Sequence, residues 1–106
     1  MDTNFVIIIT ACPSREEADT LATALIEGRL AACVQANPIA STYHWQGKVE
    51  QADEIRLLIK TTASCFDRIS ELVKHTLSYQ NPEILSIPIL NGSSEYLDWI
   101  DAETQR

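Results

Sequence analysis

The side chains of this sequence that suit metal chemistry are three cysteines and two histidines. Copper and zinc prefer thiolate sulfur and imidazole nitrogen as ligands, so Cys12, His75 and, less directly, Cys33 are the candidates. A specific site is usually indicated by pairs of ligands at short spacing, and these residues are scattered along the chain. We select Cys12 and His75 as the candidate metal ligands, for copper or another divalent cation, provided that the fold brings them together.

Each of these residues also has a purely structural interpretation. Cys33 stands in an apolar run, where a cysteine acts as a small buried hydrophobe. Cys65 lies near the start of a predicted helix, a position that favours a thiolate but also tolerates many residue types. His75 lies near the end of that helix, where it can interact with the helix dipole. An odd number of cysteines without a C-x-x-C pair favours reduced thiols in a reducing compartment.

A second set of residues combines charges with amphipathic aromatic rings. They are Trp45, Glu54, Lys60, Tyr79, Glu83 and Trp99. A lysine with carboxylates and a tyrosine hydroxyl suits a small polar ligand in a cleft. The same residue types stabilise subunit interfaces, because buried charges need partners and because Trp and Tyr are favoured where surfaces meet. Both interpretations stay open from the sequence.

Composition and charge exclude several classes of function. The 106 residues carry 8 Lys and Arg against 15 Asp and Glu, a net charge of −7 without a basic stripe, so we expect no nucleic-acid binding. The longest apolar run, Phe5 to Ile9, is far short of a membrane span, so no membrane association is expected. The first residues, 1–4, lack the positive start of a signal peptide. We therefore expect a single domain, 1–106, in the cytoplasm.

The elements that must position these residues follow from the apolar periodicity. Strands are predicted at 5–10, 31–46 (interrupted at Asn37-Pro38), 49–62 and 83–90, and helices follow Ser14, Ser64 and Ser94. The order β-α-β-β-α-β with a terminal helix is the split βαβ arrangement of ferredoxin-like α+β sandwiches.

Several residues predict local details of these elements. Ser14 with Glu17 forms a capping box, and Gly28 is expected to end the first helix in the left-handed conformation. Ser64 and Asp67 are expected to cap the second helix. Pro38 inside a strand predicts an edge strand or a bulge, because proline cannot donate to the ladder.

The predicted hairpin is too long for one small domain. Arms of about 14 residues at about 3.3 Å per residue would extend over about 40 Å, against a radius of gyration of about 13 Å for a chain of this length. The overhang would leave bare strand edges unless another copy pairs with them, so we expect an oligomer. A bend at Pro38 is the alternative.

Catalytic motifs are missing from the sequence. Ferredoxin-like acylphosphatases hold phosphate in a glycine-containing loop with an arginine after the first strand, and Arg15 is near that place. The preceding residues Ala11-Cys12-Pro13-Ser14 contain no glycine. The sequence also has no nucleophile elbow, phosphate-binding P-loop or dinucleotide fingerprint. We expect no enzymatic activity.

Several short blocks, in order and spacing, resemble the CutA family. They are LAACV at 30–34, YHWQGKVE at 43–50, Glu54 with LIKTT at 58–62, YQNPEI at 79–84, IPI at 87–89, Asn91-Gly92 and YLDW at 96–99. The resemblance implies a fold similar to that of the PII signalling proteins and a compact homotrimer whose hairpins pair between subunits. It also implies a role in tolerance of divalent cations, copper binding in some members, and no established reaction.

One departure from the family pattern concerns copper. Members credited with copper binding resemble one another in a Cys at the end of the first strand and a His before a Pro-Tyr pair. Here Thr10 stands at the strand end, and Leu77 and Ser78 precede Tyr79. The expected function is thus a non-enzymatic homotrimer in the response to divalent metal ions, with weak copper binding at most. The alternative is a PII-like sensor that binds a small anionic metabolite at inter-subunit clefts.

Overall fold

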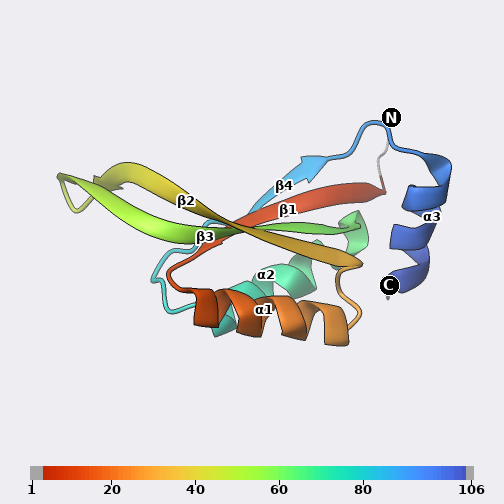
Figure 1. Cartoon of the computed structure of the whole chain (residues 1–106), viewed down its shortest axis with the longest axis horizontal. Coiled ribbons are helices and arrows are strands. Elements are labelled where there is room, and N and C mark those ends of the chain that lie inside the picture. The colour runs from red at the N-terminus through yellow and green to blue at the C-terminus, as the bar shows by residue number, and fades with distance from the viewer. Residues whose placement is uncertain (1–3, 105–106) are drawn as a thin grey trace.

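Four strands form one antiparallel sheet in a computed structural model of the chain, which describes residues 4–104 (Figure 1). The sheet order is β2-β3-β1-β4. The strands are β1 (Phe5–Cys12), β2 (Cys33–Trp45), β3 (Lys48–Thr62) and β4 (Leu85–Pro88). The helices are α1 (Arg15–Glu27), α2 (Phe66–Thr76), which follows the 3₁₀ turn η1 (Ala63–Cys65), and α3 (Ser94–Glu103). This order confirms the predicted ferredoxin-like α+β fold.

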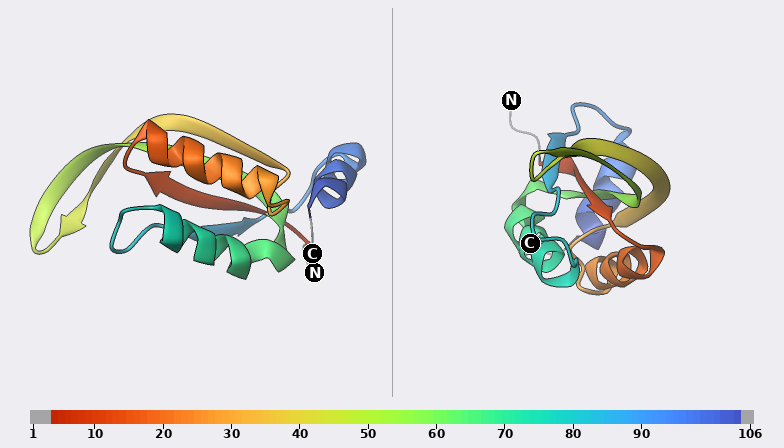
Figure 2. Two further views of the ribbon diagram at one scale, coloured as in Figure 1. Left: turned by 90° about the horizontal axis from the view of Figure 1, so that it is seen from below. Right: turned by 90° about the vertical axis from the view of Figure 1, so that its left-hand side faces the viewer.

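Helices α1 and α2 lie side by side on one face of the sheet (Figure 2). The core fills the space between them, with Ile8, Leu21, Leu57 and Ile69 fully buried. On the other face of β1, residues such as Ile7 are only half-buried in the single chain. Within residues 4–104 no layer of helices covers this second face of the sheet, so β1 is buried on one side only in a single subunit.

One predicted helix end agrees with the structure, and two differ from it. Ser14 Oγ accepts from Glu17 N–H at 3.2 Å, as expected of the cap. Gly28 has φ −78°, and the left-handed residue is the next one, Arg29, with φ 57°. Ser64 does not cap α2, because η1 continues into the helix and makes Cys65 the N-cap, without a side-chain cap bond.

The β2–β3 hairpin is continuous through the proline. Pro38 pairs with Ile55 in an unbroken register, so the predicted bulge and interruption are wrong. The other expectation for a proline strand is met, because β2 lies at an edge of the sheet. At the opposite edge, β4 is shorter than the predicted 83–90.

The hairpin projects past the rest of the sheet (Figure 1). Of β3, only residues 55–62 pair with β1, so residues 48–54 pair with β2 alone among the described strands. The chain measures 44 × 28 × 22 Å. The predicted overhang is therefore present. Helix α3 packs at the opposite end, and no helix within residues 4–104 is long and apolar enough to cross a membrane.

Candidate functional site

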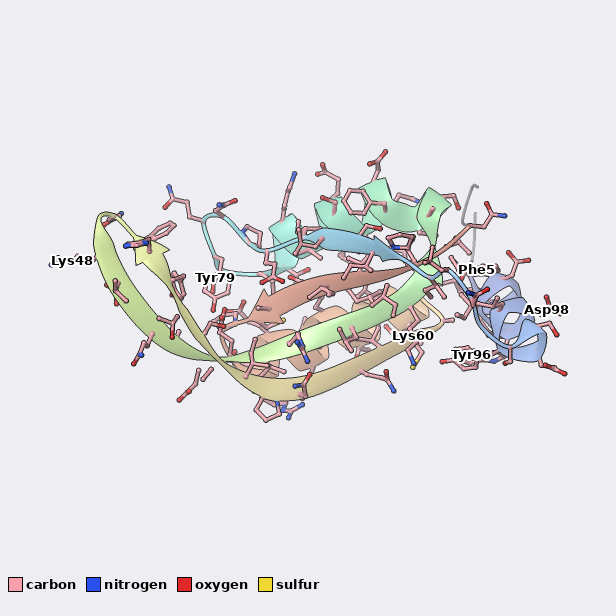
Figure 3. The ribbon with its side chains drawn as sticks, turned by 90° about the horizontal axis from the view of Figure 1, so that it is seen from above. Phe5, Lys48, Lys60, Tyr79, Tyr96 and Asp98 are labelled. Atoms are coloured by element: carbon pink, nitrogen blue, oxygen red, sulfur yellow. The ribbon has the colours of Figure 1, made fainter. Side chains whose placement is uncertain are left out.

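A groove of about 720 Å³ lies where the projecting hairpin faces the loop 77–84, which connects α2 to β4. It contains four of the six residues predicted for a ligand cleft, namely Trp45, Glu54, Tyr79 and Glu83. The other lining residues are Ala11, Ser41, Thr42, Tyr43, His44, Ser78, Gln80 and Asn81. Figure 3 shows Tyr79 on the loop, on the side that faces the hairpin.

A short hydrogen bond connects the two walls of this groove. Tyr79 Oη donates to Glu54 Oε2 at 2.6 Å. Burial raises the pKa of Tyr79, and the hydrogen bond and charge of Glu54 raise it further, so the phenol keeps its proton and donates. Cys12 pairs with Ile55, which makes Glu54 the first residue of β3 beyond the end of β1. The overhang thus exposes this carboxylate to the groove.

The loop that carries Tyr79 is anchored to α1. The Glu17 carboxylate accepts from Ser78 N–H at 2.9 Å and from Ser78 Oγ at 2.8 Å. On the other side of Ser78, Leu77 is buried in the core. Together these contacts fix the backbone next to Tyr79, so Glu17 and Ser78 are positioning residues of the groove.

The candidate metal ligand Cys12 faces the core in this fold. It is fully buried at the end of β1. Burial raises the pKa of its thiol to about 11, and the negative charges of Glu17 and Glu54 contribute to the increase. Metals bind the thiolate, so this thiol would have to lose a strongly held proton first.

The other soft ligands are dispersed. His75 is exposed near the end of α2, while Cys33 is half-buried at the start of β2. Cys65 is buried, with Arg68 Nη2 and Thr62 Oγ1 each 3.6 Å from its sulfur. None of the three cysteines, which all lie within residues 4–104, forms a disulfide. Within residues 4–104, no three His, Cys, Asp or Glu side chains are grouped so that they could hold a metal ion.

The remaining two predicted cleft residues, Lys60 and Trp99, lie at the opposite end of the sheet from the groove. Lys60 Nζ donates to Tyr96 Oη at 3.3 Å and lies 5.3 Å from the centre of the Tyr96 ring. The Tyr96 and Trp99 rings are 5.5 Å apart. Figure 3 shows Lys60 and Tyr96 at the α3 end. A single chain therefore separates the six residues into two clusters, of which the second attaches α3 to β3.

A second groove, of about 540 Å³, lies beside the β1–α1 connection. Its lining includes Arg15 together with Asp53 and Glu54. The two carboxylates oppose the binding of a phosphate at Arg15, in line with the missing glycine cradle of the sequence.

Comparison with known proteins agrees with this architecture. The family model described as CutA1 divalent ion tolerance protein matches residues 6–103. This chain belongs to the CutA family. The divalent-cation tolerance protein CutA of Thermus thermophilus is 48% identical over 100 residues, which cover 93% of this chain and 96% of that protein.

Two solved CutA structures are also similar to this family member. One is the periplasmic divalent cation tolerance protein CutA from Archaeoglobus fulgidus, with a TM-score of 0.93 at 42% identity over 95% of this chain and 99% of the other. The other is CutA1 from Oryza sativa, with a TM-score of 0.95 at 36% identity over 98% and 96%. The predicted family and fold are both confirmed.

Two residues that contribute to these contacts, Glu17 and Tyr96, were not predicted as site residues. The sequence identifies Glu17 only as a member of the predicted capping box. In the structure its carboxylate accepts a hydrogen bond from Ser78, 61 positions away. Tyr96 appears in the YLDW block, but nothing in the sequence pairs it with Lys60. Contacts between such distant positions have no local pattern from which they can be predicted.

Proposed function

We propose that this CutA family member is a cytoplasmic homotrimer that acts without catalysis in the response to divalent metal ions. The family and its named relatives support the metal-ion role, since their names describe divalent-cation tolerance and no reaction. The observation that carries the oligomer is the uncovered hairpin and sheet edge of the single chain.

The uncovered surfaces are apolar as well as unpaired. On the hairpin Val49 is 67% exposed, and after β4 Leu90 is 71% exposed. On β4 itself Leu85 and Ile87 are also exposed. Burying such residues contributes about 25 cal/mol per Å² of apolar surface removed from water. Exposed strand edges with apolar side chains associate readily, so we expect a second copy of this chain to bury them.

The two free edges of the sheet belong to different strands, β2 and β4. Pairing of the β2 edge of one copy with the β4 edge of the next would be a heterologous contact, which closes into a ring when the rotation permits. The resemblance to the CutA family supports three subunits as the size of that ring.

Substitutions on the β4 edge and on the projecting part of the hairpin test the proposal. Ile87→Asp and Val49→Asp place a charge on the surfaces that the assembly would bury, and we expect both to shift the protein towards smaller species in analytical ultracentrifugation. Thr20→Asp adds the same charge on the exposed outer side of α1 and should leave the assembly intact. Equal sedimentation of all three variants and the wild type would exclude the β4 edge and the projecting hairpin as the interface.

Copper is expected to bind weakly. Burial raises the pKa of Cys12, and Leu77 and Ser78 stand where the family pattern has a histidine and a proline. The expectation that Thr10 ends the first strand is corrected, because β1 continues to Cys12. A calorimetric copper titration of the wild type beside Cys12→Ser and His75→Ala should give no tight stoichiometric site, with any weak binding reduced by the Cys12 substitution. One tight equivalent per subunit that survives Cys12→Ser would contradict both the weak binding and the choice of ligand.

A second candidate function is that of a small-molecule sensor that uses the groove. The Tyr79–Glu54 hydrogen bond favours it, because a polar pair is held in place inside a groove whose volume lies within the usual range of about 300–1,000 Å³ for ligand sites. Calorimetry with small charged molecules on the wild type and on Tyr79→Phe separates this function from a purely structural role.

A further inference from the structure

We infer that the groove between the hairpin and the loop 77–84 binds a small organic cation, with an ammonium group seated between aromatic rings and carboxylates. This inference rests on the second candidate function above and names its ligand class. The proposed ligand is a cation, whereas the PII-like alternative of the sequence analysis has an anionic metabolite as its ligand.

The charge of the groove lining favours a cation. In the single chain its acidic side chains are Glu54 and Glu83, and none of the lining residues is a lysine or an arginine. His44 is the basic group of the lining. Lys48 pairs with Trp45 next to the hairpin turn but does not line the groove. An anion would therefore meet two negative charges without a permanent positive partner.

Residues next to the groove lining add to the negative electrostatic potential in the groove. Glu17 lies at its rear, where its carboxylate holds Ser78. Glu54 uses Oε2 to accept from Tyr79, and the described residues give its Oε1 no hydrogen-bond partner. Tyr79 stays neutral and adds no positive charge. A ligand with N–H donors or a positive charge can satisfy the remaining oxygen of Glu54.

The aromatic rings supply the second half of a cation site. Tyr43 and Trp45 line the groove and are each 41% exposed. They are two residues apart on β2, so their side chains emerge on the same face of the strand. The faces of such rings attract ammonium groups, and tryptophan does so most strongly. Two rings beside two carboxylates form a chemically consistent site for an amine or a quaternary ammonium.

A metal cation suits this groove less well than an organic one. Divalent metals require several ligands that converge on one point. Within the described part of the chain, no group of three His, Cys, Asp or Glu side chains meets that need. An ammonium group instead tolerates a loose arrangement of rings and single carboxylates.

The test uses tryptophan fluorescence, because the chain has two tryptophans and only Trp45 lines the groove. The variant Trp99→Phe, in its native assembly, makes Trp45 the sole reporter. Tetramethylammonium chloride is titrated at pH 8, above the range in which imidazole is ordinarily protonated. Parallel titrations use sodium chloride at equal ionic strength, tert-butanol as a neutral molecule of the same shape, and sodium glutamate as an anion. We expect a saturable change with tetramethylammonium alone.

Matched variants in the same background identify the site. Glu54→Gln and Glu83→Gln should each weaken the response by about fivefold, the size of one partly exposed charge contact. Glu71→Gln removes an exposed carboxylate of α2, outside the groove, and should change nothing. Glu83→Gln keeps the test valid if Glu54→Gln disturbs the fold, because Glu83 is exposed.

Three outcomes would overturn the inference. A saturable response to glutamate would reverse the ligand charge while leaving the sensor function in place. A response to tert-butanol equal to that of tetramethylammonium would show that charge does not contribute. No saturable response to any of these molecules, with the assembly intact by sedimentation, would remove both the cation site and the sensor function and leave the trimer proposal standing.

Discussion

Cys12 shows at the scale of a single residue how the fold decides the chemistry of a side chain. The sequence makes it the most plausible soft metal ligand near the end of the first strand. In the structure it faces the core, where burial and two neighbouring carboxylates hold the thiol protonated. A sequence position can suggest a ligand, but the direction of the side chain depends on strand register and on where the helices pack.

The raised pKa of Cys12 predicts a pH dependence of stability. In the unfolded chain the thiol ionises near 9, and in the folded chain near 11, so the folded state is the one that retains the proton. The contribution to stability is complete below about pH 9 and is lost as the pH rises to about 11, with a ceiling of about 3 kcal/mol.

Guanidinium unfolding of wild type and Cys12→Ala at pH 8 and pH 10.5 measures this effect. The wild type should lose more stability between the two pH values than the variant, which has no thiol to titrate. An equal loss in both proteins would show that Cys12 ionises alike in the folded and unfolded states.

At the scale of elements, the connection after α1 determines how α3 is held. Arg29 adopts φ 57°, a conformation that costs a residue with a side chain about 1–2 kcal/mol. This residue donates from Nη2 to Ala102 O at 3.1 Å and lies 3.8 Å from Glu103 Oε1, at the C-terminal end of α3. Cations stabilise that end of a helix, whereas the exposed ion pair itself adds little.

Two substitutions separate the backbone strain at Arg29 from the contact with α3. Arg29→Ala keeps the strain and loses the contact, so we expect it to destabilise the protein by about 1 kcal/mol. Arg29→Gly loses the contact but relieves the strain, and it should be more stable than Arg29→Ala by about 1 kcal/mol. Thermal unfolding of the three proteins checks this order. A glycine variant no more stable than the alanine variant would contradict the assigned strain.

The sequence predicts most elements correctly because their apolar periods are local. It misplaces the left-handed residue by one position, at Gly28 instead of Arg29, because both residues fit a helix end. At Pro38 it predicts an edge strand or a bulge, and the structure has the edge strand with an unbroken register. Four cleft residues come together because the hairpin folds over one loop. Lys60 does not join them, since it lies six positions beyond Glu54 on the same strand, about 20 Å away.

For the whole molecule, the main feature is the set of unpaired strand edges and uncovered surfaces of the single chain. The sheet has two free edges, one face of β1 is half-covered, and the hairpin turn extends beyond the core (Figure 1). The chain also carries a net charge of −7, which opposes non-specific association, so assembly must depend on specific apolar and strand contacts. Sequence alone predicts the overhang from strand length, but it does not specify which edges remain free.

The mass of the native assembly tests the central claim most directly. Native mass spectrometry of untagged protein at micromolar concentration, supported by light scattering, reports the number of subunits and any retained metal or small molecule. We predict a single species of about 35 kDa, three chains of 11.8 kDa each, that persists on dilution. A stable monomer of 11.8 kDa would contradict the account, because the hairpin and both sheet edges would then remain exposed to water.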